Sequence, residues 1–149
     1  EKTVFSPGKE LKILSLTNGT RIGIQLCVET HYPEITQTLA LRGAEVVFAP
    51  HAVPRISGNR EKIWSKYIPA RSYDNRIYMA CCNLWDNTSF GGGCLVTGPR
   101  GEVVSACFDG KAFLLVCEID EDLIASFRTL GNKRSAHFYP SLRRPELYE

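Results

Sequence analysis

The sequence predicts an α/β domain built around a mixed sheet. Short apolar or alternating runs that are typical of strands are separated by segments in which apolar residues recur at helical spacing. Two tight turns, Asn18-Gly19 and the GPRG of residues 98–101, each lie between neighbouring strand-like runs and predict antiparallel hairpins within the sheet. At 149 residues the chain fits one domain, and no internal repeat divides it.

The first half of the chain is expected to hold a loop, two strands, a helix and a third strand. These occupy residues 1–10, 11–16, 21–26, 32–42 and 44–50. Residues 11–16 alternate as in a strand, and the more continuous apolar runs after them predict largely buried strands. In the helical segment, Ile35 and Leu39 share one stripe, and Gly43 suits the C-cap.

The second half is expected to continue with a helix, a strand, a hairpin, a strand, a helix and an extended arm. These occupy residues 59–76, 77–84, 89–107, 113–120, 121–133 and 141–149. Pro69 should interrupt the first of these helices, because proline cannot donate an interior hydrogen bond. Acidic residues open the last helix, where they suit the helix dipole. Strands and helices therefore alternate through most of the chain.

The composition excludes several functional classes. The 18 basic and 16 acidic residues give a net charge of +2, and no basic cluster is interleaved with aromatic residues as in nucleic-acid readers. No apolar stretch approaches the ~20 residues of a membrane helix, and no targeting signal is visible. We therefore expect a cytoplasmic protein with no nucleic-acid or membrane partner.

Six cysteines raise the question of disulfides or a metal site. Most lie in or beside strand-like segments, without CxxC spacing or the Cys/His pattern of zinc fingers. Cys81 and Cys82 are neighbours on one predicted strand, so their side chains should point to opposite faces. We expect reduced thiols that pack as small hydrophobic groups, with no metal and no cofactor.

Cys27 differs from the other cysteines because it lies where a buried strand stops and a helix begins. Ligands bind at the carboxyl ends of strands in open α/β sheets, and free amides at a helix start favour a nearby negative charge by about 0.3–1 kcal/mol. Pro33 fits the first turn of that helix. The position makes Cys27 a candidate nucleophile, with a partly buried structural cysteine as the alternative.

Other polar groups near this segment allow two interpretations each. His31 either activates the Cys27 thiol in a Cys-His couple or lines a pocket and caps the helix. Glu29 is expected to give structural support through an ion pair with Arg71, with a catalytic base as the alternative. Further along, we expect Arg71, Asp74 and Asn75 to form a buried structural network that ties a helix to the sheet, rather than a polar catalytic set.

Six strings of the sequence, in order, carry a resemblance to a known family. They are EKTVFSPG, GIQLCVETHYPE, RGAEVVFAP, ARSYDNRIYMACCN, FGGGCLVTGPRGEVV and RRPELY. They resemble the nitrilase (carbon-nitrogen hydrolase) superfamily over nearly the whole chain, with Ser72 and Asp74 as conservative departures. The resemblance implies one half of a four-layer α-β-β-α sandwich, usually paired across its α face into homo-oligomers. Residues 1–149 then form the C-terminal portion of a single domain.

The resemblance also implies a division of chemical roles. Cys27 is expected to attack a carbonyl carbon and form a thioester, with the backbone amide of Val28 as an oxyanion donor. Glu1 occupies the position of a second, supporting glutamate. The residues expected to line the substrate pocket are Thr30, His31, His51 and Ala52.

Two further roles of the family have no matching residue here. In the family, the general-base glutamate and the oxyanion-stabilising lysine lie upstream of the segment that begins here at Glu1. The loss of a positioned base lowers the reaction rate by a factor of about 10²–10⁴. We therefore expect a hydrolase of small linear amides or N-carbamoyl compounds whose N-terminal half is missing, with the fragment alone inactive. True nitrilases favour a tryptophan directly after the nucleophile, where this chain has Val28. We therefore expect amides rather than nitriles as substrates.

Two alternatives stay open at this point. One is a catalytically silent family member, or a half-chain that serves as an assembly subunit. The other is a thiol hydrolase that uses Cys27 and His31 as a couple, in which His31→Ala abolishes turnover.

Overall fold

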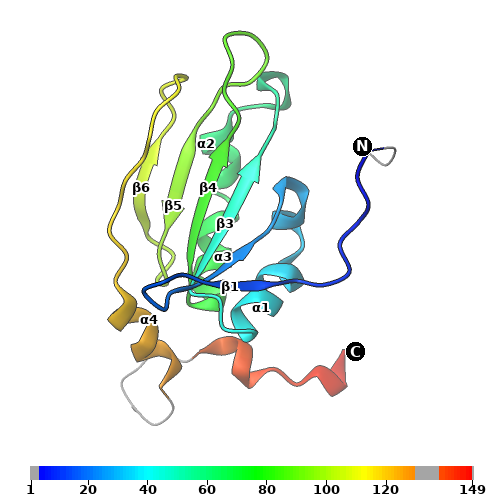
Figure 1. The fold of residues 1–149 in the computed structure, drawn as a ribbon, viewed down its shortest axis with the longest axis vertical. Coiled ribbons are helices and arrows are strands. Elements are labelled where there is room, and N and C mark those ends of the chain that lie inside the picture. The colour runs from blue at the N-terminus through cyan, green and yellow to red at the C-terminus, as the bar shows by residue number, and fades with distance from the viewer. Residues whose placement is uncertain (1–3, 130–137, 149) are drawn as a thin grey trace.

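The predicted α/β fold with a mixed sheet is confirmed. The computed structural model describes residues 4–129 and 138–148. Its six strands lie in the order β1-β2-β3-β4-β5-β6, with β2, β3 and β4 parallel and the other neighbours antiparallel (Figure 1). The strands are β1 (Ile13–Ser15), β2 (Arg21–Ile24), β3 (Val46–His51), β4 (Tyr78–Asn83), β5 (Cys94–Thr97) and β6 (Val103–Cys107).

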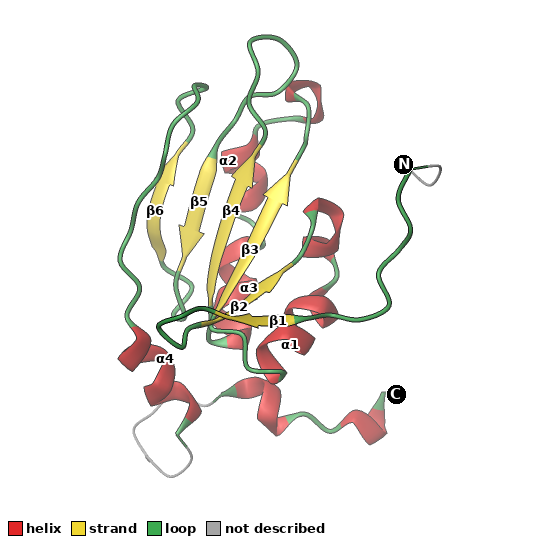
Figure 2. Ribbon diagram, viewed as in Figure 1, coloured by secondary structure: helices red, strands yellow, loops and turns green. Residues whose placement is uncertain are grey.

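Helices cover the two faces of the sheet unequally (Figure 2). One face receives α1, α2 and α3, whereas α4 packs on the other face. The α-helices are α1 (Pro33–Leu41), α2 (Arg60–Trp64), α3 (Ile68–Asn75) and α4 (Glu121–Arg128). The 3-10 helices are η1 (Cys27–His31), η2 (Arg55–Ser57), η3 (Tyr139–Leu142) and η4 (Pro145–Leu147). None of the helices in the described part of the chain combines the length and apolar character needed to cross a membrane.

Two glycines complete turns that the sequence predicts. Gly19 adopts φ 95° in the β1-β2 turn, and its N–H donates to the Leu16 carbonyl at 2.9 Å. Gly43 adopts φ 100° after α1, and its N–H donates to the Ala40 carbonyl at 2.9 Å. Glycine adopts these left-handed conformations without the steric cost of a side chain, so both predictions are confirmed.

Strand alternation divides the hydrophobic core between the two faces of the sheet. On β3, Val47 and Ala49 are fully buried beneath the helices of the first face, whereas Val46 packs with Ile124 of α4 on the second face. The core beneath α1, α2 and α3 positions the carboxyl ends of the parallel strands. It therefore also positions the site described below.

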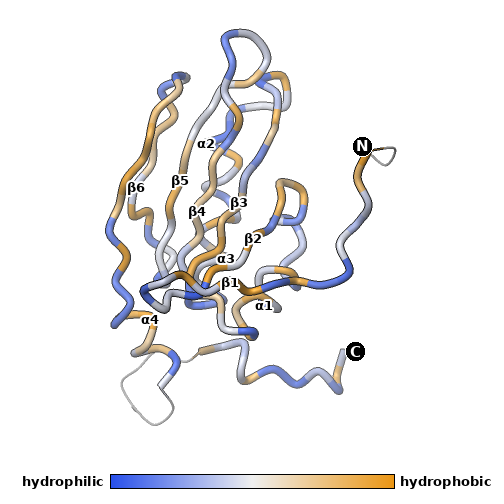
Figure 3. Tube along the Cα trace, viewed as in Figure 1, coloured by the Kyte–Doolittle hydropathy of each residue, from blue (hydrophilic) through white to orange (hydrophobic). Residues whose placement is uncertain are grey.

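Part of the second face is uncovered. Ile24 of β2 is 48% exposed, and its register partner on β3, Phe48, is 42% exposed. The prediction that these strands are largely buried is therefore wrong in part, because only the first face is covered along its length. Cys81 is buried and Cys82 is exposed, as expected for side chains on opposite faces. Figure 3 shows the hydrophobic stretches on β3 and β4.

Three predicted elements differ from the observed ones. Residues 59–76 form two helices, α2 and α3, and Pro69 lies in the first turn of α3, where its missing N–H leaves no bond unmade. Residues 113–120 alternate in burial but form no regular strand, since Leu115 and Ile119 pack on the second face without ladder hydrogen bonds. In place of a simple extended arm, the tail contains η3 and η4.

The last predicted α-helix begins where the acidic residues indicate. Asp120 is its N-cap, and the side chain accepts from the Leu123 N–H at 2.9 Å. The helix ends at Arg128, and residues 130–133 of that prediction lie outside the described residues.

Candidate active site

The Cys27 residue lies at the carboxyl end of β2, as the sequence predicts. β2 ends at Ile24, and the first residue of η1 is Cys27. Cys27 adopts φ 41°, a left-handed conformation that costs a non-glycine residue about 1–3 kcal/mol. The residue is half-buried. The helix that starts at Cys27 is the short η1, because α1 begins only at Pro33. Strained residues of this kind cluster at functional sites.

Hydrogen bonds fasten η1 to its neighbours. The Glu29 carboxylate accepts from the Leu26 N–H at 2.6 Å, and the Glu29 N–H donates to the Leu26 carbonyl at 2.8 Å. The fully buried side chain of Gln25 donates to the Glu29 carbonyl at 2.8 Å and accepts from the Thr36 hydroxyl at 2.9 Å. These bonds stabilise the strained conformation of Cys27 between β2 and α1.

Thr30 joins Cys27 to two other parts of the chain. Its hydroxyl, on a fully buried residue, donates to the Cys27 carbonyl at 2.7 Å. The same oxygen lies 3.3 Å from the Tyr67 hydroxyl and 3.5 Å from Nε2 of His51. Because the Cys27 carbonyl takes the Thr30 proton, Tyr67 is the donor in its contact with Thr30. The structure therefore brings three predicted site residues together around one hydroxyl: Cys27, Thr30 and His51.

His51 is a neutral ring held in one orientation. Its Nδ1 lies 2.8 Å from the Ala49 carbonyl, which only accepts, so Nδ1 carries the proton and Nε2 does not. Burial lowers the pKa of His51 below its ordinary value of 6.5, and the nearby charge of Arg60 lowers it further. The ring packs against Trp64 with centroids 4.8 Å apart. In this state His51 offers no positive charge to a substrate.

Tyr67 is a member of this cluster that the sequence does not reveal. In the sequence it belongs to the apolar stripe of a predicted helix, and no motif marks it. Burial raises the pKa of its hydroxyl, which keeps the proton that it donates toward Thr30. The exposed ring of His31 packs on Tyr67 with centroids 4.8 Å apart. Within the described part of the chain, no hydrogen bond joins His31 to the Cys27 thiol.

The remaining predicted residues near the thiol take different positions. The amide of Val28 belongs to the first turn of η1, where N–H groups have no intrahelical acceptor, so its position suits an oxyanion donor. Ala52 is exposed in the loop after β3. Glu29 supports η1 but forms no ion pair with Arg71 among the described residues. Glu1 lies outside the described residues.

The network predicted on α3 is observed only in part. Asn75 is buried and its amide donates to the Arg71 carbonyl at 2.8 Å within the helix, but Asp74 is exposed. The link between helix and sheet is made instead by Ser72, whose hydroxyl lies 2.5 Å from that of Thr97 on β5. A contact that ties α3 to the sheet is therefore present as expected, but Ser72 makes it.

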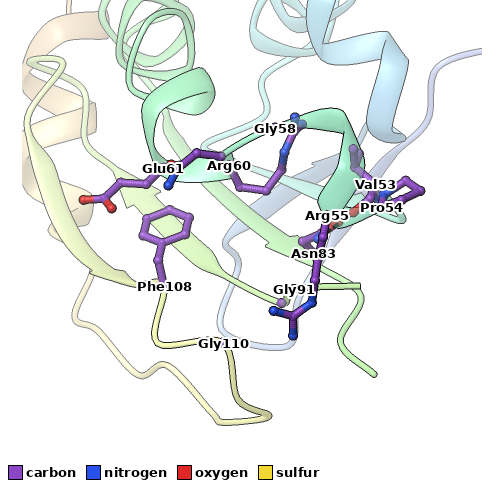
Figure 4. A pocket seen from close by; sticks show the side chains of 12 residues that line it. Val53, Pro54, Arg55, Gly58, Arg60, Glu61, Asn83, Gly91, Phe108 and Gly110 are labelled. Carbon is purple, nitrogen blue, oxygen red and sulfur yellow. Dashed lines mark hydrogen bonds between the residues drawn. The ribbon is translucent and has the colours of Figure 1, made fainter. Parts of the chain in front are cut away.

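A cavity of about 330 Å³ opens beyond the carboxyl ends of β3 and β4 (Figure 4). Its wall includes Val53, Arg55, Arg60, Asn83 and Phe108, and the Cys27 thiol is not part of it. Asn83 anchors the loop after β3, because its side chain accepts from the Val53 N–H at 2.8 Å and donates to the Val53 carbonyl at 3.1 Å. The cavity and the Cys27 cluster thus adjoin the same end of the sheet.

Burial and bonding state describe the other cysteines. All six thiols are free. Burial raises the pKa of Cys81, Cys82 and Cys94 above the ordinary value for a thiol, which disfavours the reactive thiolate at neutral pH. Across the described ranges, no group of three or more His, Cys, Asp or Glu residues is placed to hold a metal ion.

Comparison with protein-family models decides the family. The model of the carbon-nitrogen hydrolase family matches residues 1–129. The chain belongs to this family. The resemblance to this family is therefore confirmed, and the matched residues include the first five of the six sequence strings.

The chain is similar to several amidases. It is 27% identical to an omega-amidase of Saccharomyces cerevisiae over 132 residues, which cover 86% of this chain and 44% of that protein. It is 29% identical to an N-carbamoylputrescine amidase of Solanum tuberosum over 164 residues, which cover 100% of this chain and 53% of that protein. An amidase of the nitrilase superfamily from Nesterenkonia superposes with a TM-score of 0.75 at 26% identity, covering 99% of this chain and 50% of that one.

The chain spans about half the length of the curated relatives it matches. Its fold is accordingly that of one half of a nitrilase-superfamily amidase. In one variant of the Nesterenkonia amidase, the acetamide moiety of fluoroacetamide is covalently attached to the active-site cysteine. In another, acrylamide has added to that cysteine in a Michael reaction.

Proposed function

We propose that this chain supplies the cysteine nucleophile of a carbon-nitrogen hydrolase that acts on small linear amides or N-carbamoyl compounds. The observation that carries the proposal is the placement of Cys27, half-buried and left-handed at the carboxyl end of β2, with its carbonyl held by Thr30. Family membership supports the reaction type. The amidase relatives support amide or carbamoyl substrates over nitriles.

The proposed reaction has two steps. The Cys27 sulfur attacks the carbonyl carbon of the substrate, and the Val28 amide donates to the oxygen that gains negative charge. The C–N bond then breaks, the amine leaves with a proton, and a thioester forms at Cys27. Water attacks the thioester, the acid departs, and the thiol regains its proton.

The described groups around Cys27 position the thiol rather than activate it. The unprotonated nitrogen of His51 faces Thr30, and His31 packs on Tyr67. These contacts favour a general base and a lysine supplied by the other half of the family domain, with Glu1 in its supporting position. They argue against a Cys-His couple, and they agree with the expectation that this chain alone is inactive.

The assembly and location of the protein are part of the same proposal. We infer a homo-oligomer in the cytoplasm, paired as the family resemblance implies, with a small molecule as its substrate. A silent or assembly subunit is the second candidate. The observation that favours it is the uncovered second face, where Ile24 and Phe48 are exposed side by side.

Alkylation by iodoacetamide, followed by intact-mass measurement and peptide mapping, separates the two candidates. The enzyme proposal predicts that Cys27 is labelled first, that butyramide slows this labelling, and that Cys94→Ala leaves the Cys27 rate unchanged. Labelling of Cys27 that is no faster than that of Cys94, or that butyramide does not slow, contradicts the proposal and favours the assembly role.

A further inference from the structure

Three free thiols form a row across neighbouring strands of the sheet. Cys82 of β4 lies opposite Cys94 of β5, and Cys94 in turn lies opposite Cys107 of β6. Directly opposed residues of antiparallel strands project from the same face of a sheet. Cys81 belongs to the core beneath α1, α2 and α3, so its neighbour Cys82, and the row with it, lies on the second face. The three strands lie side by side in Figure 1.

The hydrogen-bond phase of β4 distinguishes one pair within this row. The Leu84 N–H donates to a carbonyl of β3 at 2.8 Å, whereas the Asn83 N–H donates to the Gly93 carbonyl, next to β5, at 2.9 Å. Because the backbone groups of successive residues point to opposite sides of a strand, those of Cys82 point toward β3. Cys82 and Cys94 are therefore a pair without hydrogen bonds between their backbones, the kind of pair in which side chains lie closest.

The spacing of this pair suits a disulfide. Opposed residues of this kind have Cα atoms about 4.5 Å apart, and a disulfide spans Cα atoms about 4.4–6.8 Å apart. By the same alternation, Cys94 and Cys107 form a hydrogen-bonded pair, whose side chains lie further apart. Burial is the main cause of the raised pKa of Cys94, the Cys82 thiol is the next, and the Cys107 thiol follows. This order agrees with Cys82 as the nearer neighbour.

The pair lies at the base of the loop that connects β4 to β5. Cys82 is exposed and Cys94 is half-buried, so a reagent in solution meets Cys82 first. Residues 83–93 join the two cysteines, and Asn83, Gly91 and Gly92 of this loop line the cavity beyond the ends of β3 and β4. A bond between the two sulfurs would therefore close the loop covalently beside the cavity.

We propose that Cys82 and Cys94 are a redox modification site that forms a reversible disulfide with a small-molecule disulfide as the oxidant. The bond joins β4 to β5 and restrains the loop that supplies part of the cavity wall. This inference goes beyond the proposed function and does not depend on it, because Cys27 takes no part in the reaction.

The proposed oxidation proceeds by two thiol–disulfide exchanges. The Cys82 thiolate attacks one sulfur of the oxidant, whose S–S bond breaks, and the first leaving thiolate takes up the proton that Cys82 lost. The Cys94 thiolate then attacks the Cys82 sulfur, and the second leaving thiolate takes up the proton of Cys94. Two cysteines are oxidised and one disulfide is reduced to two thiols. The raised pKa values slow the first attack, but the second is intramolecular and therefore fast.

Oxidised glutathione is the probe that tests the site. It is added to the folded chain carrying Cys27→Ala, which removes the proposed nucleophile from the reaction. We expect intact mass to show the loss of two hydrogen atoms per chain, and dithiothreitol to reverse it. Proteolytic cleavage before Asp86 separates Cys82 from Cys94, so that a crosslinked peptide identifies the bond, and fragmentation distinguishes Cys82 from Cys81. A lasting glutathione adduct on Cys82, a Cys94–Cys107 crosslink, or no reaction at either thiol overturns the inference.

Matched serine variants assign the two steps. Cys94→Ser should stop at a mixed disulfide between glutathione and Cys82, and Cys82→Ser should form no crosslink. Cys107→Ser is the control, because it removes the other neighbour of Cys94, and it should form the bond at the rate of the parent chain. A crosslink that is lost in Cys107→Ser, or that persists in Cys82→Ser, contradicts the assigned pair.

Thermal melting reports whether the bond fits the native sheet. The disulfide closes residues 82–94 into a loop, and a native bond across a loop of that size should raise the melting temperature by about 6–12 °C. Cys82→Ser treated in the same way should show no rise. An unchanged or lower melting temperature of the crosslinked chain would show that the bond distorts the sheet, and it overturns the inference. The proposed function would still stand, since it is tested by acylation of Cys27.

Discussion

Replacement of Thr30 by valine is the sharpest structural test of the cluster. Valine keeps the shape of the side chain but removes the hydroxyl that contacts Cys27, His51 and Tyr67. The Cys27 carbonyl and the Tyr67 hydroxyl then lose a partner in the interior, where an unsatisfied group costs about 1–3 kcal/mol. We therefore expect Thr30→Val to lower the free energy of unfolding by about 2 kcal/mol.

Two assays read out the Thr30→Val substitution. For a chain of 149 residues, a loss of that size corresponds to a fall in melting temperature of about 4–8 °C. Urea denaturation measures the free energy, and iodoacetamide labelling of Cys27 reports whether the thiol keeps its position. We expect a changed labelling rate in Thr30→Val and a rate close to wild type in Thr30→Ser, which retains the hydroxyl.

Thr38→Val is the matched control for this substitution. The Thr38 hydroxyl donates to the Glu34 carbonyl at 2.7 Å within α1, so its loss should change stability by less than about 0.5 kcal/mol. If Thr30→Val is as stable as Thr38→Val and labels at the wild-type rate, the hydroxyl does not organise the site, and the reasoning is refuted.

Three further predictions concern pH, backbone conformation and capping. Burial lowers the pKa of His51, so the unfolded chain binds a proton at this residue before the folded chain does as the pH falls below 6.5. The free energy of unfolding should therefore decrease below that pH, by at most about 1.4 kcal/mol per pH unit. In urea titrations, His51→Gln should flatten this slope. Gly93→Ala should lower the free energy of unfolding by about 2 kcal/mol or more, because φ is 107° and the new Cβ would lie 2.7 Å from the Phe108 ring. Gly110→Ala, at φ 77° with open space around it, should lower it by less in the same thermal melt. Equal losses in the two variants would contradict this prediction. Glu29→Ala should destabilise the fold by about 1 kcal/mol through loss of the η1 cap, whereas an unchanged melting temperature would contradict the capping role.

Local sequence signals predicted the parts of the fold that depend on local chemistry. Asn18-Gly19 marked the hairpin, and Gly43 marked the end of α1, because each needs a backbone conformation that few residues adopt. The position of Cys27 at a strand end followed from an apolar run that stops there. The motif strings added the family, which no periodicity argument supplies.

Local sequence signals do not predict the cluster around Thr30. Thr30, His51 and Tyr67 lie on separate elements, and their meeting depends on how β3 and the helices pack on the sheet. Likewise Ser72, two residues before Asp74 on α3, makes the contact with the sheet. Periodicity shows which face is buried but not which neighbour lies there.

Residues 113–120 show the same limit for strands. Their apolar run predicted a strand, and Leu115 and Ile119 are partly buried on one side of the segment. A strand also requires a partner that accepts and donates ladder hydrogen bonds, and an apolar run carries no information about that partner.

The acyl adduct of Cys27 tests the central claim most directly. The chain is incubated with p-nitrophenyl butyrate, whose leaving group departs without protonation, and the products are examined by intact mass and peptide mapping. The account predicts one butyryl group per chain, attached to Cys27, absent in Cys27→Ala and retained in Cys94→Ala. Butyryl groups spread over other cysteines, or an unchanged adduct in Cys27→Ala, would contradict it.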